Sequence, residues 1–134
     1  MEKSFLIKDY MNPNPVTVKP ETSISDVIKL ILKHKVSGVV VADQSKNYFG
    51  VLSELDCLKI TSESIYNEGQ NACSPYAQDI MKTDVATASP DEGLFDILIC
   101  MLDEGQRRRP VIEDGKLIGQ VTCRHLLKAI INFC

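Results

Sequence analysis

The sequence has no long hydrophobic run, no paired-cysteine motif and few histidines, and each absence narrows the possible functions. No apolar stretch approaches the roughly 18 residues of a membrane-spanning helix, so we expect no membrane segment. Residues 2–3 are Glu-Lys, and no apolar stretch with a small-residue cleavage site follows them. We therefore expect no signal peptide and a cytoplasmic location. The five cysteines include no C-x-x-C pair and only two histidines could join them, so we expect reduced thiols and no metal site.

Basic residues are outnumbered by acidic ones. The chain has 15 Lys and Arg against 18 Asp and Glu, a net charge of −3, whereas a generic nucleic-acid binder carries a basic face. We therefore expect no binding to a nucleic-acid duplex. The one basic run, Arg107-Arg108-Arg109, is too short to follow a duplex but can hold one small anion. A solvated basic loop is the alternative interpretation of this run.

What is present is an ordinary globular composition, with 134 residues of which 44% are apolar and 25% charged, and an internal repeat. Asp9-Tyr10-Met11 recurs as Asp79-Ile80-Met81, and Gly50-Val51-Leu52-Ser53 recurs as Gly119-Gln120-Val121-Thr122. Two copies are too few for a solenoid and indicate a pair of modules that share one core. Apolar residues at helical spacing also recur: Ile24, Val27, Ile28 and Ile31 match Leu94, Ile97, Leu98 and Met101.

Each copy predicts the same order of elements, β-α-β-β-α. The first helix is expected to begin near Ser23 in one copy and near Ser89 in the other. Ser53 and Thr122 are expected to cap the closing helices, and Gly105 to end the first helix of the second copy. The expected strands are 16–18, 39–41 and 48–52 in the first copy and 86–88, 110–112 and 117–121 in the second.

With its Asp-x-Met leads and a Gly-x-x-Ser-x-x-Asp run at 50–56, this arrangement resembles a tandem pair of cystathionine β-synthase (CBS) domains, often called a Bateman module. The resemblance implies an α/β (α+β) fold of two β-α-β-β-α units packed with pseudo-two-fold symmetry, as in stand-alone CBS-pair proteins. It divides the chain into motif 1 (1–62), a connector (63–75) and motif 2 (76–134). It also implies a homodimer and clefts for adenosyl ligands such as AMP, ADP, ATP, S-adenosylmethionine or NAD(H).

The strongest candidate site begins with Ser53 and Asp56. A carboxylate one turn into a helix can accept hydrogen bonds from both vicinal hydroxyls of a ribose, and the helix N-terminus offers free N–H groups. The same spacing is also an ordinary helix cap, so both interpretations stay open. With the resemblance added, the favoured ligand site comprises Ser53, Asp56, Thr83, Asp84, Val85, Arg107 and Arg108, in which the arginines would reach phosphate.

The matching second site departs from the pattern, because His125 stands where the first copy has Asp56. A neutral imidazole has one donor and one acceptor and cannot chelate two hydroxyls as a carboxylate does. This cleft is therefore expected to be empty or to bind something different, and a packing histidine is the simpler interpretation of His125. The second, degenerate site comprises Asn14, Pro15, Ser37, Gly38, Val39, Thr122 and His125.

The leading hypothesis is a non-catalytic regulatory module that senses an adenine nucleotide and requires no cofactor. The alternative is a ligand-free assembly adaptor that dimerises and docks on an unknown partner protein. An enzyme is not expected, because no nucleophile, base or metal cluster of a familiar arrangement occurs in the sequence.

Overall fold

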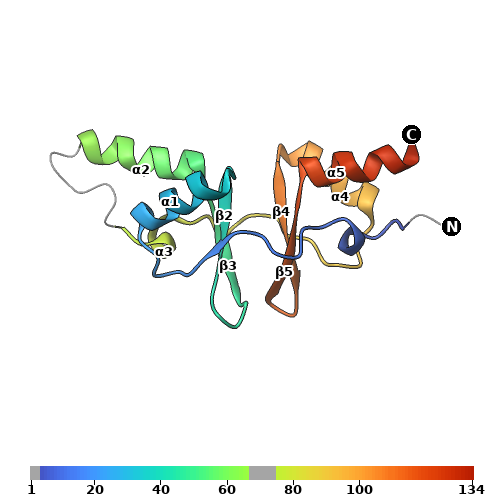
Figure 1. The fold of residues 1–134 in the computed structure, drawn as a ribbon, viewed down its shortest axis with the longest axis horizontal. Coiled ribbons are helices and arrows are strands. Elements are labelled where there is room, and N and C mark those ends of the chain that lie inside the picture. Colours follow the sequence, from blue (N-terminus) through green and yellow to red (C-terminus); the bar gives the residue numbers. More distant parts are fainter. Residues whose placement is uncertain (1–3, 67–74) are drawn as a thin grey trace. The chain divides into compact units, whose positions relative to one another are not determined.

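The computed structural model of the chain describes residues 4–66 and 75–134 and divides into two compact units (Figure 1). The first-repeat unit is Val16–Val85, and the second-repeat unit combines the chain up to Pro15 with Ala86–Cys134. Each unit therefore takes its lead segment from the other half of the sequence. The predicted boundaries at 62 and 76 concern the repeats along the sequence and stay a prediction.

The first-repeat unit contains a three-stranded sheet in the order β1-β2-β3. β1 (Thr17–Val18) runs parallel to β2 (Gly38–Ala42), and β2 runs antiparallel to β3 (Tyr48–Ser53). The helices are α1 (Ile24–His34), α2 (Glu54–Tyr66) and the short α3 (Ala77–Ile80). Its buried core consists of Val18, Ile24, Val27, Ile31, Val39, Val41, Leu52, Cys57 and Ala77.

The second-repeat unit contains an antiparallel pair, β4 (Arg108–Glu113) and β5 (Lys116–Thr122). The α-helices are α4 (Leu94–Glu104) and α5 (Cys123–Ile130), and two short 3-10 helices, η1 (Ile7–Asp9) and η2 (Ile131–Phe133), complete it. Its core consists of Ile7, Ala88, Leu94, Ile97, Met101, Val111, Val121, Leu126 and Ala129. The repeat thus gives each unit its own core, whereas we expected one shared core.

The strand expected at 86–88 does not form. Only Ala88 bridges to Val111, whereas in the first-repeat unit the Val40 N–H also donates to the Val16 carbonyl at 3.0 Å. The residue that matches Val40 is Pro110, which has no N–H to donate. One hydrogen bond of the parallel ladder is therefore lost.

The first helix of the second copy begins later than its sequence predicts. Its N-cap is Gly93, not a residue near Ser89, because Ser89 and Glu92 close a turn of their own. The Leu94 N–H is satisfied by the Phe5 carbonyl at 2.7 Å. A carbonyl of the lead segment thus satisfies the first N–H of α4. Because the N-cap is a glycine, no side chain marks the start of this helix in the sequence.

Other helix ends agree with the prediction. The Ser23 hydroxyl accepts from the Asp26 N–H at the start of α1. Gly105 ends α4 in a left-handed conformation, with φ of 62°. The helix α2 continues to Tyr66, past the expected connector boundary at 63, and residues 67–74 of the connector lie outside the described part of the chain.

Candidate functional site

Ser53 and Asp56 form a reciprocal cap at the start of α2. The Asp56 Oδ2 atom accepts from the Ser53 backbone N–H and hydroxyl, both at 2.9 Å, and the Ser53 Oγ atom accepts from the Asp56 N–H at 3.2 Å. The Asp56 side chain is 11% exposed, so its orientation is held by this cap. The two interpretations of the motif are therefore compatible, because one carboxylate oxygen serves the cap and Oδ1 points elsewhere.

The other oxygen of Asp56 meets Lys82, which the sequence analysis missed. The Lys82 Nζ atom lies 3.4 Å from Asp56 Oδ1, and the lysine side chain is 61% exposed. Lys82 is brought there by its backbone, which exchanges hydrogen bonds of 3.0 and 2.9 Å with Val51 on β3. Its position directly after the Asp79-Ile80-Met81 lead is the signal that could have identified it.

A glycine makes this approach of the lead segment possible. A Cβ atom placed on Gly50 would lie 2.5 Å from the Lys82 carbonyl oxygen. The repeat has the same device, because a Cβ on Gly119 would lie 2.8 Å from the Asn12 carbonyl oxygen, and Asn12 bridges to Gln120 on β5. The glycine of the motif is thus required by backbone packing in both units.

The segment that follows Lys82 carries the residues expected to contact adenine. Thr83 and Asp84 are exposed and Val85 is half-buried, in a stretch without regular secondary structure. They belong to the same unit as Ser53 and Asp56. The structure therefore brings these five predicted residues into one unit.

The predicted arginines belong to the second-repeat unit. Arg107 is exposed and Arg108 is half-buried opposite Thr122 at the start of β4. Arg109 is a structural residue: its guanidinium is buried and donates to Glu104 at 2.6 Å and to Gln106 at 2.8 Å. A site that joins Arg107 and Arg108 to Asp56 stays a prediction.

The second copy repeats the cap with a histidine. The His125 Nδ1 atom lies 3.1 Å from the Thr122 backbone nitrogen and 2.9 Å from the Thr122 hydroxyl, which in turn accepts from the His125 N–H at 3.3 Å. Burial, and then the positive charge of Lys128, lower the pKa of His125 below its ordinary value. His125 thus takes part in the helix cap at the start of α5 through its Nδ1 atom.

The remaining predicted residues of the second site divide between the units. Ser37, Gly38 and Val39 lie in the first-repeat unit, where Gly38 pairs with Ser53 and the Ser37 carbonyl accepts from α2 at 2.9 Å. Asn14 and Pro15 lie in the second-repeat unit with Thr122 and His125. The second site likewise stays a prediction.

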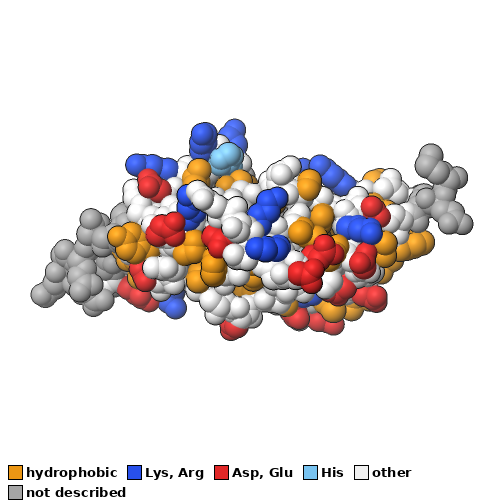
Figure 2. Space-filling model, turned by 90° about the horizontal axis from the view of Figure 1, so that it is seen from below, with side chains coloured by type: hydrophobic (Ala, Val, Ile, Leu, Met, Phe, Trp, Pro, Cys, Tyr) orange, Lys and Arg blue, Asp and Glu red, His pale blue; other side chains and the backbone are white. Residues whose placement is uncertain are grey.

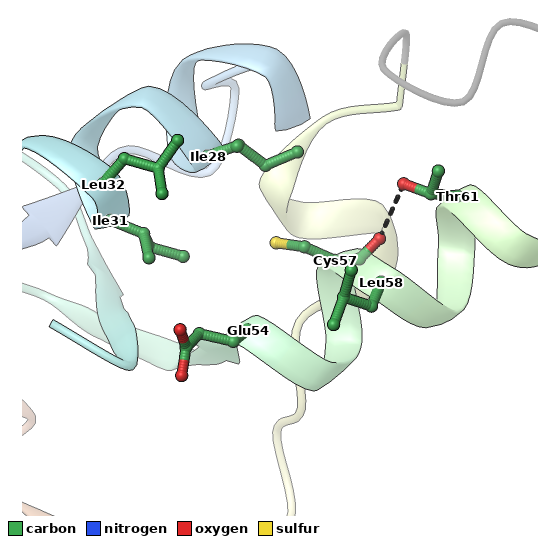
Figure 3. Close-up of a pocket in the computed structure, with 7 residues that line it drawn as sticks. All are labelled: Ile28, Ile31, Leu32, Glu54, Cys57, Leu58 and Thr61. Carbon is green, nitrogen blue, oxygen red and sulfur yellow. Dashed lines mark hydrogen bonds between the residues drawn. The ribbon is translucent and has the colours of Figure 1, made fainter. Parts of the chain in front are cut away.

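A groove of about 170 Å³ lies between α1 and α2, and none of the predicted ligand residues is among those that line it (Figure 3). Ile28, Ile31 and Leu32 of α1 face α2, and the Cys57 thiol points into the space between the helices (Figure 3). Glu54 lies at one end of it. Its lining is too apolar for a phosphate and suits apolar side chains.

In the part of the chain that the structure describes, no helix is long and apolar enough to cross a membrane. The described residues also contain no group of three or more His, Cys, Asp or Glu side chains that could hold a metal ion. On the face drawn in Figure 2, acidic, basic and hydrophobic side chains are interspersed.

The family model of the CBS domain matches the chain twice, at residues 7–63 and 77–132. Among curated proteins, the uncharacterized protein MJ1426 of Methanocaldococcus jannaschii is 29% identical over 94% of this chain and 91% of its own length. The CBS domain-containing protein CBSX2 of Arabidopsis thaliana, a chloroplastic protein, is 30% identical over 96% of this chain and 64% of its own length.

Solved structures of CBS-domain proteins are also similar to this chain. The crystal structure of CBSX2 in complex with AMP has a TM-score of 0.85 at 28% identity and covers 97% of this chain and 98% of that one. The CBS domain pair of MJ0100 in complex with 5′-methylthioadenosine and S-adenosyl-L-methionine has a TM-score of 0.78 at 24% identity, covers 96% and 98%, and so shows the fold. With two matched regions that cover most of its length, the chain belongs to the CBS domain family as a tandem pair.

Proposed function

We propose that the chain is a non-catalytic regulatory module that binds an adenosyl nucleotide such as AMP, ADP or ATP. The observation that supports this most is Asp56, a carboxylate held in one orientation by Ser53 with Oδ1 directed toward Lys82. The AMP complex of the similar protein CBSX2 supports the ligand class. The favoured residues are those named from the sequence, with Lys82 added.

In this proposal, the ribose hydroxyls donate to Asp56 Oδ1. Lys82 yields that oxygen at little cost, because an ion pair with an exposed lysine contributes at most about 1 kcal/mol in water. The displaced ammonium then stays close enough to attract a phosphate. Thr83, Asp84 and Val85 supply backbone groups and a small apolar surface for adenine, and Arg107 and Arg108 supply further phosphate contacts.

A thermal-shift panel with AMP, ADP, ATP, NADH and S-adenosylmethionine tests the proposal. A ligand at about 100 times its dissociation constant adds roughly 2.7 kcal/mol to the free energy of unfolding, which raises the melting temperature by several degrees. We expect at least one ligand to do so in the native chain and to lose the effect in Asp56→Asn. No shift with any ligand would contradict the proposal.

The control must separate ligand binding from the helix cap. Asp56→Asn keeps an oxygen that can accept from Ser53, so the cap is retained in part. Asp26→Asn is the matched control, since Asp26 occupies the same position after Ser23 in α1 and its side chain is 63% exposed. We expect ligand binding to be unchanged in Asp26→Asn.

Assembly with a second copy of the chain is the other function that a specific observation favours. Leu32 on α1 and its repeat partner Leu102 on α4 are 70% and 73% exposed, and Leu58 on α2 and its partner Leu127 on α5 are 64% and 68% exposed. Each unit thus presents the same apolar helix face, which favours a self-complementary contact between copies. We propose a homodimer through these faces.

Light scattering after size exclusion tests the homodimer. We expect the native chain to elute with twice the mass of the monomer and Leu58→Glu to elute as a monomer. Lys59→Glu is the control, because Lys59 is an exposed residue beside Leu58 on the same helix and carries no apolar surface of this face. A native monomer at high concentration would contradict this part of the proposal.

A further inference from the structure

The closing helices of the two repeats are capped by different side chains, a carboxylate in α2 and an imidazole in α5. In the first-repeat unit Asp56 Oδ2 accepts two hydrogen bonds from Ser53, both at 2.9 Å. In the second-repeat unit the Nδ1 atom of His125 takes that place toward Thr122, at 3.1 Å from the backbone nitrogen and 2.9 Å from the hydroxyl. A carboxylate oxygen has two lone pairs and can accept from two donors, whereas the imidazole nitrogen has one lone pair, which both Thr122 groups approach.

The contact with the Thr122 backbone fixes the protonation state of His125. A backbone N–H is only a donor, so Nδ1 must be the acceptor and the ring proton must lie on Nε2. A protonated imidazole carries hydrogens on both nitrogens, so it can accept a hydrogen bond from neither the backbone N–H nor the hydroxyl of Thr122. Protonation therefore removes the backbone bond to Nδ1, whereas the 3.3 Å bond from the His125 N–H to the Thr122 hydroxyl does not involve the ring.

The charged groups on α5 oppose protonation as well. Lys128 follows one turn after His125 on the same helix, and the exposed Arg124 precedes it. The positive end of the helix dipole lies at the same terminus. No acidic side chain forms an ion pair with His125 among the described residues. The helix α4, which shares the core with α5, ends in Asp103 and Glu104, and Glu104 pairs with Arg109.

Next to the cap, β4 and the lead segment bring basic and uncharged residues. On the β4 side, Arg108 pairs in register with Thr122, and the Arg107 carbonyl accepts from the first residue of α5 at 3.0 Å. The lead segment contributes the uncharged Asn12, which bridges to Gln120 where the first-repeat unit has Lys82. The charged residues that these elements place around the terminus are therefore cationic.

We propose that the Thr122–His125 cap is a pH-sensitive switch, which is reciprocal while His125 is neutral and loses its imidazole half, loosening the N-terminus of α5, when His125 binds a proton. The matching cap of the first-repeat unit has the carboxylate of Asp56 in place of the imidazole. α5 carries Leu126 and Ala129 into the core of its unit, so release of its first turn loosens that core near the cap. This inference does not depend on nucleotide binding.

The direction of the effect follows from linkage. Burial and Lys128 lower the pKa of His125 from the ordinary value of 6.5, so the unfolded chain binds a proton more readily than the folded one. The free energy of unfolding therefore keeps this contribution above about pH 6.5 and loses it as the pH falls through the lowered pKa. Acidification therefore weakens the N-terminus of α5.

Nuclear magnetic resonance on the full native chain tests the switch directly. The chain has two histidines, so the ring signals can be assigned with His34→Gln. We expect His125 to carry its proton on Nε2 at about pH 7.5 and to titrate below 6.5, with the protection of the Thr122 and His125 amides against exchange, relative to their intrinsic rates at each pH, falling through the same transition. A proton on Nδ1, or a titration midpoint at or above 6.5, would overturn the proposal.

A variant provides the second test. His125→Asp copies the cap of the first repeat, and we expect it to abolish the loss of melting temperature that accompanies His125 titration. His34→Gln should retain that loss, because His34 is an exposed residue at the end of α1. An unchanged pH dependence in His125→Asp would contradict the proposal, and the native-chain titration decides the question if this variant does not fold.

Discussion

The Nζ atom of Lys82 lies 3.4 Å from the Oδ1 atom of Asp56, the carboxylate oxygen that takes no part in the helix cap. The contact joins the lead segment of one half of the sequence to the closing helix of the other. It also places a cation beside the residue proposed to hold the ribose. Lys82 is therefore suited to respond to a phosphorylated ligand and not to adenosine itself.

Lys82→Met should lower the affinity for AMP without unfolding the protein. The lysine is 61% exposed, so we expect the free energy of unfolding to change by less than about 1 kcal/mol. Calorimetric titration with AMP and with adenosine measures the difference, which should be large for AMP and small for adenosine. Lys29→Met is the control, because Lys29 makes the comparable exposed contact with Asp26 at 3.9 Å. Equal losses for both ligands would count against a phosphate contact.

Gly50→Ala should disturb the same site from the strand side. The new Cβ would lie 2.5 Å from the Lys82 carbonyl oxygen, and a backbone atom cannot move aside as a side chain can. We expect the free energy of unfolding to fall by about 1–3 kcal/mol in urea titration. Gly93→Ala is the comparison: its nearest neighbour at 2.9 Å is the flexible Asp96 carboxylate, so the loss should be smaller. A stability of Gly50→Ala equal to that of the native chain would show that the close approach does not exist in solution.

Glu104→Ala should lower stability and leave AMP affinity unchanged. It removes the 2.6 Å hydrogen bond from the buried guanidinium of Arg109 to Glu104. The hydrogen bond from that guanidinium to Gln106 remains. Glu104 is itself half exposed, so we expect a moderate loss of about 1–3 kcal/mol in the free energy of unfolding. Asp103→Ala, an exposed neighbour on α4, should stay within about 0.5 kcal/mol. Loss of AMP binding in Glu104→Ala would instead place Arg109 in the ligand site.

Arg107→Ala tests the other side of the basic run. Arg107 is exposed, so its removal should leave the melting temperature almost unchanged. We expect weaker binding of AMP and a smaller effect on adenosine, measured by the same calorimetry. Arg124→Ala is the control, since it removes an exposed arginine of α5 that is outside the proposed site. If both variants bind AMP as the native chain does, Arg107 is part of a solvated loop.

Local patterns predicted the elements whose determinants are adjacent in the sequence. Ser23, Ser53 and Thr122 cap helices through residues three positions later, so spacing alone identified them. The start of α4 has no side-chain cap to mark it, because Gly93 stands where the first copy has Ser23, and the carbonyl that accepts from Leu94 belongs to Phe5 in the lead segment. Such a partner becomes visible only when the chain has folded.

The same distinction applies to the candidate site. Ser53 and Asp56 could be named from their motif, and the structure joins them as the spacing required. Lys82 was missed although it directly follows the Asp79-Ile80-Met81 lead, because its approach to Asp56 depends on backbone pairing with Val51. The strand at 86–88 is missing because Pro110, on the strand that it would pair with, has no N–H to donate.

The central claim is that Asp56 receives the ribose of a nucleotide. Calorimetric titration of the native chain and of Asp56→Asn, with AMP and with 2′,3′-dideoxy-AMP, measures it most directly. The claim predicts that the native chain binds AMP more tightly than the dideoxy analogue and that this difference disappears in Asp56→Asn. Equal binding of the two ligands by the native chain, or an undiminished difference in the variant, would contradict it.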